Sequence, residues 1–183
     1  MRKREFALPV EKCPLCGSEG TFSVRGRIDD IPYFGEIMET LALCTRCGFR
    51  QSDVMQTESR EPRVYEFEIT SEDDMKVRVV KSSTGVIKIP ELEVVVKPGP
   101  ASQGYVSNVE GVLDRVMEAM RIATQSAGQE GRRRGRENMD RIERIKRGEE
   151  RAKLIILDPK GNSAIVDGRA TVKPLQGSDL DDI

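Results

Sequence analysis

The sequence contains no histidine and no tryptophan, and aromatic residues account for only 4% of its 183 positions. Without histidine, the chain has no imidazole general base and no Cys–His or Ser–His pair for nucleophilic catalysis. Any zinc site must therefore be closed by cysteine thiolates alone. The few aromatic residues, within a hydrophobic content of 37%, predict an aliphatic core of moderate size.

Long apolar segments are also missing from the chain. No stretch approaches the roughly 20 apolar residues that a membrane-spanning helix needs. No apolar segment follows the charged residues 1–5, as a secretory signal would require. The 30 basic and 31 acidic side chains leave a net charge of -1, whereas dedicated nucleic-acid-binding proteins normally carry a basic excess. We therefore expect a cytoplasmic protein that binds no membrane, with nucleic acid as the less favoured partner.

The four cysteines form two Cys-x-x-Cys pairs, and a glycine follows each pair directly. In a reducing compartment such cysteines are better interpreted as metal ligands than as disulfides. The 27 residues between the pairs suffice for a β-ribbon that brings four thiolates to one tetrahedral zinc ion. The predicted ligands of one structural Zn²⁺ are Cys13, Cys16, Cys44 and Cys47. A thiol redox centre is the alternative, since Cys-x-x-Cys also occurs in disulfide oxidoreductases.

Short alternating segments predict that most of the chain is β-structure. Around the cysteines, strands are expected over 21–28 and 38–43, with a third after Cys47. Further along, strands are expected over 64–69, 75–80, 86–89, 92–96, 154–157 and 163–166, separated by turn-forming residues. The turn at 158–162 is typical of a β-hairpin between the last two strands.

Two helices are expected to interrupt these strands. The first begins at a capping box over 107–110, with Ser107 as the cap, and ends near Gly128. The second, over 137–153, carries only a thin apolar stripe and should project from the body. These elements predict a mainly β fold with a zinc ribbon, or finger, over 1–59 and a β domain over 60–176. A helical hairpin is inserted at about 107–153, and an acidic tail covers 177–183.

Some motifs admit both a functional and a structural interpretation. The basic run Arg132, Arg133, Arg134 and Arg136 could contact RNA or an acidic protein, but a solvated hairpin tip is favoured. The segment 31–35 concentrates aromatic residues, and packing between finger and β domain is favoured over an exposed docking patch. Asp158 and the pair Asp73–Asp74 are assigned to turns. Paired carboxylates, phosphate loops and nucleophile elbows are absent from the sequence, so we expect no enzymatic activity.

Several motifs, in their order along the chain, resemble the ZPR-one family of zinc-finger proteins. They are Ile31-Pro32-Tyr33-Phe34 with Glu36-Ile37, Cys44-Thr45-Arg46-Cys47-Gly48-Phe49-Arg50, Ile89-Pro90-Glu91-Leu92-Glu93, Val109-Glu110-Gly111-Val112-Leu113 and Leu157-Asp158-Pro159-Lys160-Gly161-Asn162-Ser163. The resemblance covers about 12–167, nearly the whole chain. Eukaryotic members carry two copies of a finger-plus-β-domain module, whereas this chain is similar to the single-module form found in archaea.

The resemblance implies a fold and a partner. The β domain of the family is a double-stranded β-helix with an inserted helical hairpin, which agrees with the element order expected here. Eukaryotic members bind translation elongation factor one-alpha, prefer its GDP-bound form and assist its folding. The implied function is a non-enzymatic zinc-binding adaptor or folding factor that docks on this GTPase. The alternative is a nucleic-acid-binding zinc ribbon protein of transcription or ribosome function.

Overall fold

Antiparallel strands make up the N-terminal part of the chain. The computed structural model describes residues 4–31, 35–56, 61–177 and 179, and here the sheet has the order β1-β2-β3-β4. The strands are β1 (Arg4–Lys12), β2 (Glu19–Ile31), β3 (Gly35–Cys44) and β4 (Arg50–Gln56). The last three were expected. The sequence analysis did not predict β1, which contains Pro9 and lies at the sheet edge, where proline is tolerated.

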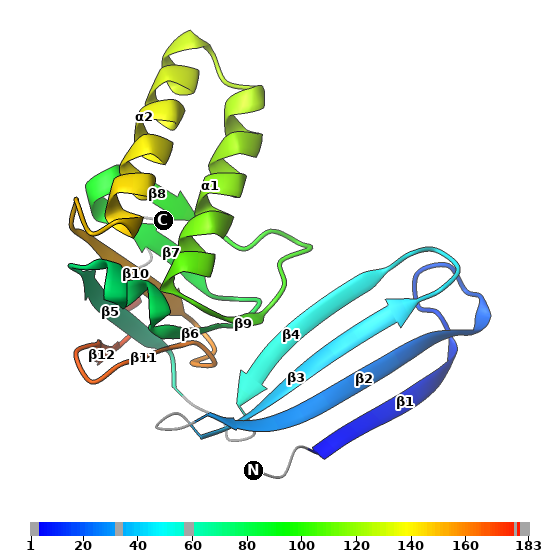
Figure 1. The fold of residues 1–183 in the computed structure, drawn as a ribbon. Coiled ribbons are helices and arrows are strands. Elements are labelled where there is room, and N and C mark those ends of the chain that lie inside the picture. The colour runs from blue at the N-terminus through cyan, green and yellow to red at the C-terminus, as the bar shows by residue number, and fades with distance from the viewer. Residues whose placement is uncertain (1–3, 32–34, 57–60, 178, 180–183) are drawn as a thin grey trace.

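Two further sheets form the second part of the molecule, which lies beside the first sheet (Figure 1). One has the order β12-β5-β10-β7-β8 and the other has the order β11-β6-β9. The larger sheet contains β5 (Arg63–Ile69), β7 (Val86–Ile89), β8 (Val94–Val96), β10 (Ala152–Asp158) and β12 (Thr171–Pro174). The smaller contains β6 (Arg78–Lys81), β9 (Tyr105–Asn108) and β11 (Ala164–Val166). The mainly β prediction is confirmed.

One aliphatic core joins these parts. Alternate residues of the central strands β5 and β10 are fully buried, among them Phe67 and Ile156, and the apolar face of the first helix covers them. Ile31, Ile37 and Val54 of the first sheet belong to the same cluster. The aromatic segment 31–35 was predicted to pack between the two parts. Its first residue, Ile31, is buried in this core, and residues 32–34 lie outside the described residues.

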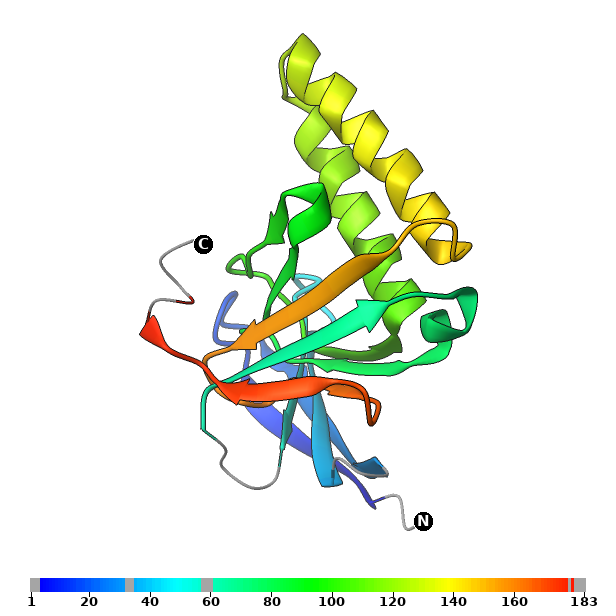
Figure 2. The same ribbon diagram turned by 90° about the vertical axis from the view of Figure 1, so that its left-hand side faces the viewer.

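A hairpin of two helices rises from the second part (Figures 1 and 2). Helix α1 (Val109–Gln125) begins at Asn108, whose side-chain oxygen accepts a hydrogen bond from the Gly111 amide at 2.9 Å. The predicted cap at Ser107 is therefore wrong by one residue. Helix α2 (Gln129–Lys146) is fully buried at Ile142 and Ile145, so its base packs into the core while its tip projects.

The predicted range 137–153 for the second helix is wrong at both ends. The sequence interpretation placed a turn across the glycines of 128–135, but Gly135 lies inside α2 and is buried. A Cβ at Gly135 would collide with the Thr124 side chain of α1. This glycine therefore allows the two helices to approach each other closely, which local propensity does not reveal. The predicted end of the helix is instead the start of β10, paired with β5.

Some expected strands also differ from the structure. Met75 lies in a 3₁₀ helix (Glu72–Lys76) before β6, and Leu92 in another (Pro90–Leu92) before β8. The predicted hairpin around 158–162 is wrong, because β10 pairs with β5 and β7 whereas β11 pairs with β6. The turn therefore leads the chain from one sheet to the other. Turn residues specify a reversal of direction, but long-range contacts decide which sheet receives the next strand.

Hydrogen bonds hold the first sheet against the second part. The Asp53 carboxylate in β4 accepts from the Ser83 amide at 2.9 Å and from the Ser83 hydroxyl at 2.8 Å. Beside it, the Gly104 amide donates to the Ser52 carbonyl at 3.1 Å. Together with the shared core, these contacts fix the orientation of the first sheet relative to the second part.

Candidate metal centre

Two similar turns present the four cysteines at one end of the first sheet. Cys13 and Cys16 lie between β1 and β2, while Cys44 ends β3 and Cys47 precedes β4. In each turn a glycine amide bonds back to the carbonyl of the first cysteine, at 2.9 Å for Gly17 and 3.1 Å for Gly48. Both glycines have a positive φ, of 68° and 73°, which explains why glycine follows each pair.

The structure brings the four sulfur atoms together. All four lie within 4.8 Å of one another, with 4.0 Å between the sulfurs of Cys13 and Cys47 and 3.8 Å between those of Cys16 and Cys44. A tetrahedron with Zn–S bonds of about 2.3 Å has edges of about 3.8 Å. A disulfide needs about 2.05 Å between its sulfurs, and all four cysteines are free. The arrangement therefore fits a metal ion better than a redox disulfide.

Hydroxyl groups and backbone amides surround the sulfurs. The Ser18 hydroxyl lies 3.0 Å from the Cys16 sulfur, and the Thr21 hydroxyl lies 3.4 Å from the Cys44 sulfur. The Cys47 backbone amide, followed by the Thr21 hydroxyl, lowers the pKa of the Cys44 thiol to about 5. The Ser18 hydroxyl likewise lowers the pKa of Cys16. These groups favour the thiolate forms of Cys16 and Cys44, and the thiolate is the form that binds metal. At Cys47 the Phe49 backbone amide acts in the same direction, but the neighbouring thiols and burial outweigh it and raise the pKa to about 11.

Packing supports this end of the sheet without a large core. Cys13 and Cys44 are buried, whereas Cys16 and Cys47 are exposed. The rings of Phe22 and Phe49 stack with their centroids 6.0 Å apart and belong to the same small cluster as the two buried cysteines. Such limited apolar contact is typical of turns that a bound metal ion stabilises.

Comparison with known proteins agrees with this geometry. A family model for the ZPR1 zinc-finger domain matches residues 7–62, and one for the ZPR1 jelly-roll domain matches residues 73–176. The chain belongs to the ZPR1 family. The N-terminal sheet is thus the ZPR1 zinc finger with its four-cysteine site, and the second part is the ZPR1 jelly-roll domain carrying the helical hairpin.

Relatives in the ZPR1 family come from archaea and eukaryotes. A ZPR1-like protein of Methanocaldococcus jannaschii is 48% identical over 155 residues, covering 84% of this chain and 78% of that protein. A ZPR1-like protein of Pyrococcus horikoshii is 41% identical over 172 residues, covering 92% and 77%. The zinc finger chaperone of Schizosaccharomyces pombe is 30% identical over 108 residues, which cover 58% of this chain and 22% of that protein.

Two of the four arginines of the predicted basic run are neutralised within the ZPR1 jelly-roll domain. The run lies in the first turns of helix α2, beside the turn that joins the two helices, and its four arginines are exposed, as predicted for a solvated hairpin tip. Arg133 forms ion pairs with Glu130 and Glu137, both at 2.6 Å, and Arg134 pairs with Glu93 at 2.5 Å. Arg132 and Arg136 have no acidic partner within 4 Å among the residues that the structure describes. The pairing leaves Arg132 and Arg136 as the free cations of the run, which weakens the case for contact with a phosphate backbone.

Sequence reasoning underestimated Asp158 and Asp74. Asp158 is fully buried and accepts hydrogen bonds from the hydroxyls of Ser82 (2.9 Å), Ser163 (2.6 Å) and Thr84 (2.9 Å), not only from its own turn. Asp74 is buried beside Arg169, at 2.7 Å. Ser82 and Thr84 lie more than 70 residues from Asp158 in the sequence, as Arg169 does from Asp74, so their proximity could not be inferred from local turn chemistry.

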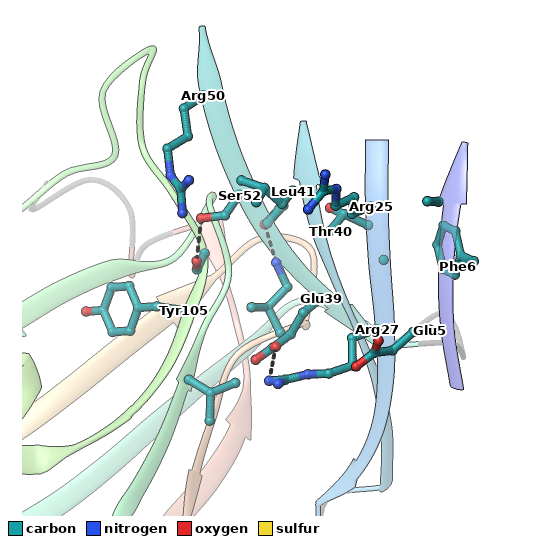
Figure 3. A pocket seen from close by; sticks show the side chains of 16 residues that line it. Glu5, Phe6, Arg25, Arg27, Glu39, Thr40, Leu41, Arg50, Ser52 and Tyr105 are labelled. Atoms are coloured by element: carbon teal, nitrogen blue, oxygen red, sulfur yellow. Dashed lines mark hydrogen bonds and ion pairs between the residues drawn. The ribbon is translucent and has the colours of Figure 1, made fainter. Parts of the chain in front are cut away.

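An open groove of about 660 Å³ lies at the junction of the two domains (Figure 3). The finger contributes Phe6, Arg25, Leu41 and Arg50, and β9 contributes Tyr105. In the part of the chain that the structure describes, Arg25 and Arg50 have no acidic partner within 4 Å, whereas Arg27 pairs with Glu39. The groove therefore combines apolar surface with two unpaired cations, and Glu5 adds an acidic group to its wall. Neither described helix is long and apolar enough to cross a membrane.

Proposed function

We propose that this protein is a non-enzymatic, zinc-binding folding factor that docks on translation elongation factor one-alpha. The partner is the one that the family resemblance implies, and the name of the fission yeast relative supports a chaperone role. Translation elongation takes place in the cytoplasm, so we place the protein there.

Zinc has a structural role in this proposal. Cys13, Cys16, Cys44 and Cys47 bind one Zn²⁺, and four thiolates leave no open coordination position for catalysis. Such a site contributes about 10–16 kcal/mol of apparent binding energy to folding. The ion thereby holds the two cysteine turns together, and metal analysis should give one zinc per chain.

The observation that carries the proposal is the groove at the domain junction. Its walls come from both domains, so it exists only while the finger is folded and held against the jelly-roll domain by Asp53. Arg25 and Arg50 supply charge, and Phe6, Leu41 and Tyr105 supply apolar contact area. Surfaces of this composition suit protein recognition, in which arginine and aromatic residues contribute much of the binding energy.

Binding to the host's elongation factor tests the proposal directly. The wild-type protein should retain the factor in a pull-down, with more retained in the GDP state than with a GTP analogue. The double variant Arg25→Glu, Arg50→Glu should weaken binding by at least about tenfold, since it reverses two charges in the groove. Arg121→Glu, an exposed change on α1 outside the groove, is the matched control. Absence of binding in both nucleotide states would contradict the proposal.

A further inference from the structure

A second cavity, of about 380 Å³, lies between helix α1 and the segment that leads into β9. We call it the α1 pocket. Its apolar wall includes Val96, Val116 and Ile122, the last of which is an exposed large hydrophobic residue at 59%. Its volume lies in the lower part of the range of roughly 300–1,000 Å³ that is typical of small-molecule sites. It is separate from the junction groove, although Tyr105 lines both.

Lys81 lines this pocket and is unusually placed for a lysine. The residue is only 5% exposed, and its Nζ donates to the Ser82 carbonyl at 2.9 Å. In the described part of the chain no carboxylate lies within 4 Å of Nζ. The carboxylates of Asp158 and Asp53 act on it from farther away, and burial lowers the pKa of its amine. An ammonium has three donors, so a buried one calls for further acceptors.

Arg115 places a second cation at the same pocket. Its guanidinium lies 4.3 Å from the centroid of the Tyr105 ring, and the Lys81 Nζ lies 5.8 Å from that centroid. Like Lys81, Arg115 has no acidic partner within 4 Å among the described residues. The one acidic residue lining the pocket, Glu118, is bound to Arg121. Lys81 and Arg115 thus share one ring, and with the exposed Lys97 they line one cavity. No anion in the described residues pairs with Lys81 or Arg115.

We propose that the α1 pocket binds a small phosphate monoester that carries an apolar group. Such a group has a charge of about -1.5 to -2 and three acceptor oxygens, which suits the ammonium of Lys81 and the guanidinium of Arg115. The Ser102 and Gln103 side chains also line the cavity and are further possible donors. Gln103 accepts from Ser52 through its Oε1, so its amide nitrogen is free to donate. The apolar group of the ligand lies against Val116 and Ile122.

Titration with phenyl phosphate, inorganic phosphate and benzoate tests this assignment. Calorimetry on the full zinc-loaded chain should show saturable binding of phenyl phosphate, with weaker binding of inorganic phosphate. The backbone amide signals of Tyr105 and Val116 should shift in nuclear magnetic resonance spectra. Benzoate binding as tight as that of phenyl phosphate would overturn the choice of phosphate, and failure of phenyl phosphate to saturate would overturn the site.

Three variants test whether phenyl phosphate binds in the α1 pocket or only follows the net charge of the chain. Arg115→Gln, at an exposed position, should weaken phenyl phosphate binding by at least about tenfold through loss of a charge-assisted hydrogen bond. Lys81→Met should weaken it at least as much, provided that its spectrum shows a folded chain. Arg136→Gln removes an exposed, unpaired cation on α2 and should leave binding unchanged. Equal losses in Arg115→Gln and Arg136→Gln would show that binding follows net charge, and the proposal would be wrong.

Discussion

Two hydroxyl groups beside the sulfur cluster make a specific prediction about metal affinity. The Ser18 and Thr21 oxygens are 2.6 Å apart, which is a hydrogen-bond distance, and each also lies near a sulfur. Two hydroxyl protons cannot serve all three contacts. If one proton links the two oxygens, only one is left for a sulfur, either Cys16 or Cys44. A single substitution should therefore leave the remaining hydroxyl free to donate to its own sulfur.

This arrangement predicts non-additive losses of zinc affinity. Ser18→Ala and Thr21→Val should each keep one hydroxyl–thiolate bond and change the zinc dissociation constant by less than about threefold. The double variant keeps none, and loss of a hydrogen bond to a charged group costs about 1.5–3 kcal/mol. Its dissociation constant should therefore rise by at least about tenfold, within the range seen when partners of metal ligands are removed.

Competition for zinc against a chromophoric chelator measures these constants. Thr45→Val is the matched control, because the Thr45 hydroxyl follows Cys44 directly but donates to the Thr21 carbonyl, not to a sulfur. It should leave the affinity unchanged. Losses that simply add in the double variant, or a double variant equal to Thr45→Val, would refute the shared-proton reasoning.

Three further predictions concern the jelly-roll domain. Burial alone would raise the pKa of Asp74, but hydrogen bonds from Thr70 and Arg169 outweigh it and lower this pKa to about 2. The charged Asp74 carboxylate therefore stabilises the fold above about pH 4, and this stabilisation is lost as the pH falls to 2. Asp74→Asn should lower the free energy of unfolding, measured in urea, by about 2 kcal/mol at pH 7 but by little at pH 2. Gly135→Ala should lower the melting temperature despite the higher helix propensity of alanine, and adding Thr124→Ser, which removes the colliding methyl group, should restore it. A quadruple variant should bind RNA or DNA with an affinity within about twofold of the wild-type value, measured by fluorescence anisotropy across a salt series. Its changes are Arg132→Gln, Arg133→Gln, Arg134→Gln and Arg136→Gln.

Clear results would contradict each of these three. An unfolding free energy of Asp74→Asn that equals the wild-type value at pH 7 would show that the buried carboxylate adds no stability. A Gly135→Ala variant that melts higher than the wild type would show that the helices can move apart at no cost. A steep loss of nucleic-acid affinity in the quadruple variant would support the alternative of a nucleic-acid-binding zinc ribbon protein.

Sequence reasoning performed best where local chemistry decides the structure. The spacing of Cys13, Cys16, Cys44 and Cys47 and the glycine after each pair were enough to predict a cluster of four sulfurs. Period-two alternation located most strands, since each has one buried face. These signals are local or depend on a fixed ligand geometry, so a single sequence contains them.

Reasoning from the sequence failed where distant residues decide the structure. Gly135 was interpreted as part of a turn, because nothing near it in the sequence shows that Thr124 lies against it. The partner strand of β11 could not be inferred from the turn that precedes it. Asp158 was assigned to a turn, although hydroxyls from the 82–84 segment also bind it. The α1 pocket also escaped notice, since Lys81 and Arg115 come from different elements.

The cysteine turns have a consequence for the contact between the finger and the jelly-roll domain. Only the residues 48–52 separate Cys47 from Asp53, and side chains on a strand alternate between faces with a period of two. A shift of β4 by one residue would turn Asp53 away from Ser83 and break the hydrogen bonds that it accepts from the jelly-roll domain. An ion held by Cys44 and Cys47 would anchor the start of β4 against β3, and so set the phase of the strand. Zinc occupancy would then determine the register of β4, and with it whether Asp53 faces Ser83 at the domain junction.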